Sequence, residues 1–97
     1  MSKVNLTIVA TVNPNGKDEL SYYLEKVGAL YKEVNAKSVQ KLKVTKPLIG
    51  SYIPSLVSIM EFQNMDSLNN VFESDAYKQL IPYREKAFSK LEAYISE

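Results

Sequence analysis

With 97 residues, 45% of them hydrophobic, the chain has room for one folded domain, which we expect to span residues 1–97. Its 12 basic and 11 acidic residues leave a net charge of +1, which gives no global electrostatic reason to expect nucleic acid or an acidic membrane as a partner. Cysteine and histidine are both absent, and this excludes disulfides, thiolate nucleophiles, zinc–sulfur sites and the commonest general base near neutral pH.

The first predicted strand runs from Val4 to Val12, where apolar residues alternate with mostly polar ones. The sequence NPNG at residues 13–16 follows it with residues typical of a turn. Apolar side chains then recur at helical spacing, which predicts an amphipathic helix over residues 17–34. Asn35 is expected to end this helix.

A second strand is predicted from about Lys37 to Val44, and its pattern could continue to Ile49. Val39 is out of phase with the other apolar residues of this strand, which indicates a β-bulge. A third strand is predicted over Leu56–Phe62, and the two strands are expected to pair as a hairpin.

Helices are predicted for most of the remaining chain. Asn64 or Asp66 is expected to cap a short helix, and Ser74 offers the cap of a second helix that runs through the sequence DAYKQLIPYREKAF. Pro82 falls inside this second helix, where its missing N–H and its ring are expected to cause a kink. The alternation in KLEAYIS, residues 90–96, predicts a last strand.

The resulting order, β-α-β-β-α-β, is typical of the ferredoxin-like fold in the α+β class. In this fold two helices cover one face of a four-stranded antiparallel sheet, with the first and third strands central and the second strand at an edge. The third strand is apolar on both sides, however, because Val57 and Ile59 point away from the side that the helices cover. An uncovered apolar face is rare in soluble monomers. We therefore predict a homodimer, the alternative being that Val57 and Ile59 stay half-exposed.

The second half of the chain carries a specific pattern: Glu-Phe at a strand end, a helix, S-x-x-Y, and then P-x-R. The residues of this pattern are Glu61, Phe62, Ser74, Tyr77, Pro82 and Arg84. With this pattern the chain resembles the small bacterial proteins of domain of unknown function 1330, in the dimeric α+β barrel superfamily. The opening strand and the long first helix fit as well, but Asn35-Ala36 and Leu42-Lys43 stand where many members have paired glycines.

The resemblance implies a dimeric α+β barrel made by the sheets of two chains, with a cavity between the sheet and the second helix of each chain. It implies no settled activity. Better-known members of the superfamily are cofactor-independent monooxygenases, which often carry histidines on the second helix. Val71 and Ala76 occupy the matching positions here, which argues against the same chemistry. We expect no metal and no cofactor.

Arg84 and Tyr77 are the leading candidates for ligand contacts. Helical spacing places them on one largely apolar stripe with Ile81 and Phe88. Because an isolated buried charge is very costly, Arg84 is predicted either to grip a carboxylate, enolate or phosphate, or to form an internal salt bridge, for example with Glu61. Tyr77 is predicted either to present its hydroxyl to the same ligand or to fill the core.

Five weaker ligand candidates are Asn5, Thr7, Thr11, Glu61 and Lys41. The first three form a polar row on the first strand, where they bind a ligand or only water and one another. Glu61 would serve as a base if it were desolvated, but pairing with a basic side chain is the simpler expectation. Lys41 is one of four lysines near the second strand, and edge strands often use lysines to block edge-to-edge pairing. No aromatic residues are interleaved with these lysines to indicate nucleic-acid binding.

Together these features predict a homodimeric protein that binds a small anionic or carbonyl-containing organic compound. It would act as a cofactor-independent enzyme or as a non-catalytic binding module, and a purely structural dimer is the remaining alternative. No apolar segment is long enough to span a bilayer, and the first residues lack the features of a signal peptide. We therefore expect no membrane partner and a cytoplasmic location.

Overall fold

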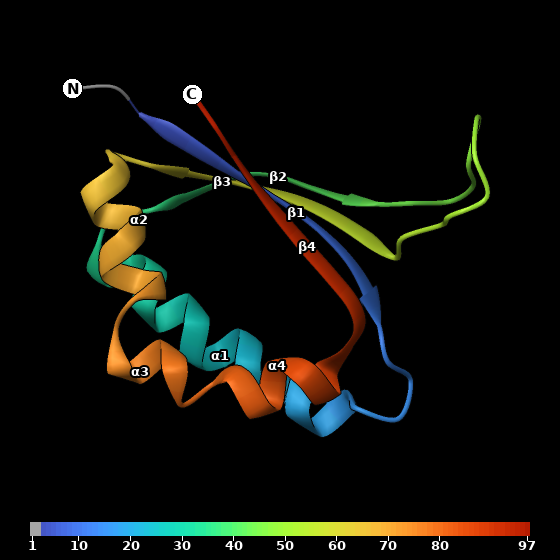
Figure 1. The fold of residues 1–97 in the computed structure, drawn as a ribbon, viewed down its shortest axis with the longest axis horizontal. Coiled ribbons are helices and arrows are strands. Elements are labelled where there is room, and N and C mark those ends of the chain that lie inside the picture. The colour runs from blue at the N-terminus through green and yellow to red at the C-terminus, as the bar shows by residue number, and fades with distance from the viewer. Residues whose placement is uncertain (1–2) are drawn as a thin grey trace.

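The computed structural model describes residues 3–97, which form two layers: a four-stranded antiparallel sheet and, on one side of it, all the helices (Figure 1). The strands are β1 (Val4–Val12), β2 (Lys37–Lys43), β3 (Leu56–Phe62) and β4 (Phe88–Ser96). The helices are α1 (Lys17–Glu33), α2 (Met65–Phe72), α3 (Asp75–Lys78) and α4 (Ile81–Ala87). The strand order is β2-β3-β1-β4, so β1 and β3 are central, as predicted. The ferredoxin-like α+β fold is thereby confirmed.

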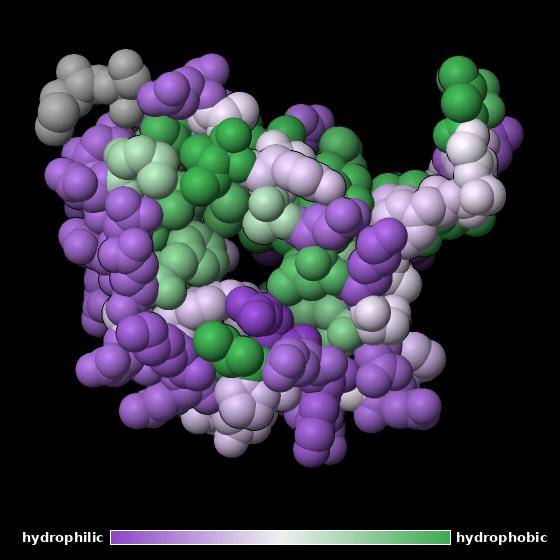
Figure 2. Space-filling model, viewed as in Figure 1, coloured by the Kyte–Doolittle hydropathy of each residue, from purple (hydrophilic) through white to green (hydrophobic). Residues whose placement is uncertain are grey.

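The β2–β3 hairpin combines a confirmed bulge with a longer connection than expected. The pairing of β2 with β3 shifts register at Val39, as the sequence predicted. The strand stops at Lys43 and does not continue to Ile49; residues 44–55 form an arm that projects beyond the sheet (Figure 1). Leu48 and Ile49 on this arm are 97% and 91% exposed, and Figure 2 shows the end of the arm as a hydrophobic surface.

The helical segment around Pro82 consists of two helices and not of one kinked helix. The single helix expected after Ser74 is divided into α3 and α4, and Pro82 lies in the first turn of α4, where a backbone N–H would have no helical partner in any case. Phe88 has extended backbone angles and begins β4. The predicted stripe of Tyr77, Ile81, Arg84 and Phe88 along one helix is therefore wrong, because Phe88 belongs to the sheet.

Two of the predicted caps begin the helices of the second half. The Asn64 side chain accepts a hydrogen bond from the Ser67 N–H at 2.8 Å and starts α2. The Ser74 hydroxyl accepts one from the Tyr77 N–H at 3.1 Å and starts α3. Such caps satisfy backbone donors that the first helical turn leaves free.

The NPNG turn before α1 is attached to the end of α4. The Asn13 N–H donates to the Ala87 carbonyl at 2.9 Å, and the Asn13 side chain donates to the Lys86 carbonyl at 3.0 Å. Gly16 makes this approach possible, because a Cβ at that position would lie 2.1 Å from the Lys86 carbonyl oxygen. Its close approach brings the beginning of α1 and the end of α4 together beside β1.

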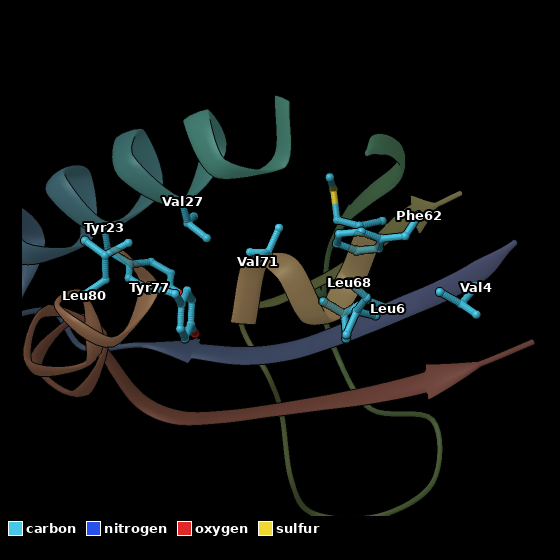
Figure 3. Close-up of a cluster of buried hydrophobic side chains, with 10 residues drawn as sticks. Val4, Leu6, Tyr23, Val27, Phe62, Leu68, Val71, Tyr77 and Leu80 are labelled. Atoms are coloured by element: carbon cyan, nitrogen blue, oxygen red, sulfur yellow. The ribbon is translucent and has the colours of Figure 1, made fainter. Parts of the chain in front are cut away.

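The buried core residues lie between the helices and the helix-facing side of the sheet (Figure 3). Val4, Leu6, Phe62 and Leu68 form one end of it, and Tyr23, Tyr77 and Leu80 form the other. Val4 pairs with Phe62, and Leu6 with Met60, so the even-numbered positions of these two strands face the helices.

The odd-numbered positions of β1 and β3 point the other way and form what we call the outer face. Their cross-strand neighbours on β2 and β4 belong to the same face, which therefore consists of Asn5, Thr7, Val9, Thr11, Leu42, Val57, Ile59, Glu61, Glu92 and Tyr94. No helix among residues 3–97 covers it (Figure 1). Val57 and Ile59 are half-buried there. Within the same range no helix has the length and hydrophobicity to cross a membrane, and the cytoplasmic location stays a prediction.

Candidate functional site

A cavity of about 450 Å³ lies between the helix-facing side of the sheet and the helices. Figure 2 shows the molecule hollowed between these two layers. Apolar side chains from β1, β3 and β4 form its floor, among them Leu6, Ile8 and Leu91. Its volume falls in the range of about 300–1,000 Å³ that is typical of small-molecule sites.

Aromatic rings form much of the cavity wall. They are Tyr23, Tyr31, Phe72, Tyr77 and Phe88. Tyr23 and Tyr31 lie on α1 at a spacing of two turns, on the stripe that faces the sheet. The ring of Tyr77 packs edge-on against Phe72 with centroids 4.8 Å apart and against Tyr23 at 6.2 Å. Such edge-to-face contacts hold the rings in fixed orientations around the open space.

The Tyr77 hydroxyl is the centre of a three-residue hydrogen-bond chain. Arg84 donates to it from Nη1 at 3.1 Å, and the Tyr23 hydroxyl lies 2.9 Å away (Figure 3 shows the two tyrosines side by side). Tyr77 and Tyr23 are only 5% and 6% exposed. Arg84 and Tyr77 thus lie together, as their helical spacing predicted, and Tyr77 both fills the core and lines the cavity. A contact of either side chain with a ligand stays a prediction.

Desolvation acts in opposite directions on the pKa of a tyrosine and on the pKa of an arginine in this hydrogen-bond chain. Desolvation raises the pKa of Tyr23 far above its ordinary value, and the neighbouring Tyr77 raises it further, so Tyr23 keeps its proton at any physiological pH. For Arg84, desolvation alone would lower the pKa, but the hydrogen bond to Tyr77 leaves the pKa raised. Among residues 3–97 the half-buried guanidinium forms no ion pair with a carboxylate.

A second hollow of about 510 Å³ adjoins the cavity and contains Arg84. Five residues line both spaces: Phe72, Tyr77, Phe88, Leu91 and Ala93. Arg84, Glu85 and Lys90 line the second hollow only, whereas Tyr23 lines the cavity only. The hydrogen-bond chain therefore leads from a polar outer hollow to an apolar inner cavity.

Polar groups also reach the cavity from the β2 side of the sheet. Lys41 lines it and pairs in register with Ser58, which is 7% exposed. Tyr31 contributes a further phenol. Its pKa is raised mainly by desolvation and to a lesser extent by the nearby Tyr77. Of the weaker candidates from the sequence, Lys41 is therefore the one that reaches the cavity.

Asn5, Thr7 and Thr11 lie on the outer face, opposite the cavity. The Thr11 hydroxyl is hydrogen-bonded to the Tyr52 hydroxyl at 2.8 Å. Ligand binding by these three residues stays a prediction, and it would require a space on that other face.

Glu61 also points to the outer face, since it is an odd-numbered position of β3. Its carboxylate lies 3.3 Å from the Lys3 ammonium. The pairing of Glu61 with a lysine is confirmed, and its proposed pairing with Arg84 is wrong because the sheet separates the two side chains. Within residues 3–97 no group of three or more carboxylates is arranged to hold a metal ion.

Tyr23 and Ser58 were not among the sequence candidates. Tyr23 belongs to the apolar stripe of α1, so its spacing predicted a core residue and not a polar contact. Ser58 did carry a signal: it is a hydroxyl residue in phase with Leu56 and Met60, on the side of β3 that was expected to face the helices.

Comparison with known proteins identifies a family and a fold. A family model described as "Domain of unknown function (DUF1330)" matches residues 7–96. No curated protein matches the sequence.

Several solved structures share the fold. The RPA0582 protein of unknown function from Rhodopseudomonas palustris has a TM-score of 0.88 at 14% identity, over 97% of this chain and 80% of that one. A dimeric ferredoxin-like protein of unknown function from Bacteroides fragilis has a TM-score of 0.62 at 10% identity, over 98% and 95% of the two chains. SnoaB from Streptomyces nogalater, described as a cofactor-independent oxygenase, has a TM-score of 0.69 at 10% identity, over 100% and 93%. At these identities the likeness shows the fold alone.

Proposed function

The chain belongs to the family described as domain of unknown function DUF1330, and we propose that it binds a small anionic or carbonyl-containing organic compound between its sheet and its helices. The observation that carries this proposal is the cavity of about 450 Å³ with aromatic walls. A filled core would leave no such space, because protein interiors are normally packed as densely as organic crystals. An apolar pocket with a few polar groups is the usual form of a small-molecule site.

The polar groups favour an oxygen-bearing ligand. Tyr77 lines both the cavity and the outer hollow, and Arg84 donates a hydrogen bond to its hydroxyl. Both side chains offer hydrogen-bond donors, and Arg84 has no carboxylate partner among residues 3–97. A donor in apolar surroundings interacts more strongly with an oxygen acceptor than it would in water.

A cofactor-independent catalytic role is the extension of this proposal that the fold supports. One protein with the same fold, SnoaB, is described as a cofactor-independent oxygenase. Donors held in place next to a carbonyl oxygen stabilise the negative charge that develops there in a transition state. In the non-catalytic alternative, the same donors hold the ligand and no turnover follows. Incubation of a bound compound with the protein, with and without oxygen, separates the two.

The homodimer is part of the same proposal, and the outer face supports it. Val57 lies between Val9 and Leu42 in the sheet, and Ile59 lies beside Thr7. These side chains form an apolar patch that a second copy would cover, and one protein with this fold is described as dimeric. Analytical ultracentrifugation at micromolar concentration tests the assembly, and a monomeric mass would refute it.

Gly28 allows a direct test of the cavity. It lines the cavity from α1, and a Cβ at this position would meet no atom within 4 Å. Gly28→Phe is expected to fill part of the space, while Gly28→Ala serves as a control that keeps most of it open. The measurement is a thermal-shift screen of small acids, phenols and quinones, with mass spectrometry of any compound that co-purifies.

We expect compounds that stabilise the wild type and Gly28→Ala to have no effect on Gly28→Phe. If they stabilise Gly28→Phe equally, they bind elsewhere and the cavity is not the site. If neither the screen nor mass spectrometry finds a compound, the proposed function is wrong.

A further inference from the structure

The hydrogen-bond chain from Arg84 to Tyr23 has a direction. A guanidinium only donates, so the Tyr77 oxygen must be the acceptor in the 3.1 Å contact with Arg84. A hydroxyl that accepts from a cation becomes a stronger donor itself. Either hydroxyl could donate across the 2.9 Å contact between Tyr77 and Tyr23, and this polarisation favours Tyr77 as the donor to the Tyr23 oxygen.

This direction leaves the proton of Tyr23 without an acceptor in the protein. Among residues 3–97, the Tyr23 hydroxyl has Tyr77 as its hydrogen-bond partner and no second one. Tyr23 lines the apolar cavity and is 6% exposed. Leaving a buried donor unpaired is costly, so the inner end of the chain is a place where a ligand acceptor is favoured.

Resting on the proposed function, we propose that Tyr23 contacts the ligand and donates a hydrogen bond to its carbonyl oxygen. Arg84 is then a positioning residue that acts through Tyr77. The outer hollow, and not the cavity, contains its guanidinium. The two phenols between the guanidinium and the ligand carry no charge. As neutral donors they are suited to bind an uncharged carbonyl oxygen, on which negative charge develops in a transition state.

This arrangement identifies the ligand class as a ketone, aldehyde or ester and not a preformed carboxylate. Two lysines also line the cavity, Lys32 and Lys41, but both are exposed. Lys41 lies on β2, at the opposite edge of the sheet from β4, whose residues line the outer hollow. Within residues 3–97 neither lysine uses its ammonium group in a hydrogen bond or an ion pair.

The test uses three probes of similar size: naphthalene, 1-tetralone and 1-naphthoate. Binding to the wild-type protein and its variants is measured by calorimetry, and infrared difference spectra give the C=O stretch of bound 1-tetralone. Tyr23→Phe removes one hydroxyl and keeps the ring. We expect it to weaken 1-tetralone about five- to tenfold, the value of one neutral hydrogen bond, and to change naphthalene less than about twofold.

Arg84→Met tests the positioning role. It is expected to weaken 1-tetralone only about two- to threefold, since the Tyr23 hydrogen bond remains but is less polarised. The C=O stretch of the bound ketone should move towards its frequency in an apolar solvent. A merely structural role for Arg84 would change the affinity of naphthalene as well and leave the C=O frequency in place.

Four outcomes overturn the inference. The first is an unshifted C=O stretch in the wild-type protein, a readout that does not depend on the folding of any variant. The second is that 1-naphthoate binds most tightly, and that its affinity falls in Arg84→Met but not in Tyr23→Phe. This would show that Arg84 contacts the ligand directly. The third is a loss of 1-tetralone in Tyr77→Phe but not in Tyr23→Phe, which would reverse the chain.

The fourth outcome concerns the proposed function itself. If none of the three probes binds the wild-type protein, the cavity proposal and the Tyr23 inference are both wrong. If naphthalene binds and Tyr23→Phe changes the affinity of 1-tetralone no more than that of naphthalene, the cavity proposal stands and the Tyr23 inference alone is wrong.

Discussion

Raising the pH is expected to unfold this protein through its buried phenols. Desolvation raises the pKa of both Tyr23 and Tyr31, and the neighbouring Tyr77 adds to the effect at each. In the unfolded chain the same hydroxyls ionise near their ordinary value of about 10. Above that pH the unfolded state binds fewer protons than the folded state, so the free energy of unfolding falls as the pH rises. Below about pH 10 both states keep the protons and these groups add no pH dependence.

The size of the effect follows from proton linkage. Each tyrosine that stays protonated in the folded state lowers the free energy of unfolding by about 1.4 kcal/mol per pH unit above about pH 10. Tyr23 and Tyr31 together give a slope of about 2.8 kcal/mol per pH unit. A small domain with a stability of about 5 kcal/mol would therefore unfold within about two pH units of pH 10.

The assay is urea unfolding between about pH 8 and about pH 11, followed by circular dichroism. Tyr31→Phe is the decisive variant, because it removes one desolvated hydroxyl from outside the Arg84–Tyr77–Tyr23 chain. Its slope above about pH 10 should be smaller than that of the wild type by about 1.4 kcal/mol per pH unit. Tyr22→Phe is the matched control, since the Tyr22 ring is exposed. Equal slopes for Tyr31→Phe and the wild type would refute the reasoning.

Three further changes test how the fold positions the site. Gly16→Ala should lower the free energy of unfolding by about 2–3 kcal/mol, since its Cβ would overlap the Lys86 carbonyl, whereas the helical control Gly28→Ala should raise it by about 0.5–1 kcal/mol in urea unfolding. Ser74→Ala should cost about 1 kcal/mol through loss of the α3 cap, and no loss in urea unfolding would show that the cap is dispensable. Glu61→Gln should change the free energy of unfolding by less than about 1 kcal/mol, as for an exposed ion pair; a cost of about 3–5 kcal/mol would indicate a buried charge partner that the structure does not show.

The sequence predicted the sheet better than the second half of the helical layer. Alternation over Val4–Val12 predicted the first central strand, because one of its faces is buried and the period of two is strict. The short apolar run Leu56–Phe62 predicted the other. The helix break at Leu80 was missed because helical periodicity continues through it. A proline inside a helical pattern is compatible with a kink or with a new first turn, and tertiary packing decides between them.

In the candidate site, the sequence predicted the contact between residues that are close along the chain but not the contact between residues that are far apart. Tyr77 and Arg84 were placed together by their seven-residue spacing, about two helical turns, and this survives the break between α3 and α4. Tyr23 is 54 residues from Tyr77 along the chain. No local pattern reports that their hydroxyls meet, because the contact depends on how α1 packs beside α3 and α4.

Side chains alternate between the two faces of β1, and this separates Thr7 from Tyr77, which the sequence analysis had both proposed as ligand contacts. Leu6 and Ile8 form the cavity floor, so Thr7, between them, points to the outer face. A ligand that contacts Tyr77 therefore cannot reach Thr7 through the sheet. Thr7→Asp should place a charge beside Ile59 and disrupt a dimer in ultracentrifugation without weakening a compound bound in the cavity. If it instead abolished that binding and left the assembly intact, the outer face would carry the site, and the assignment of the two faces would be wrong.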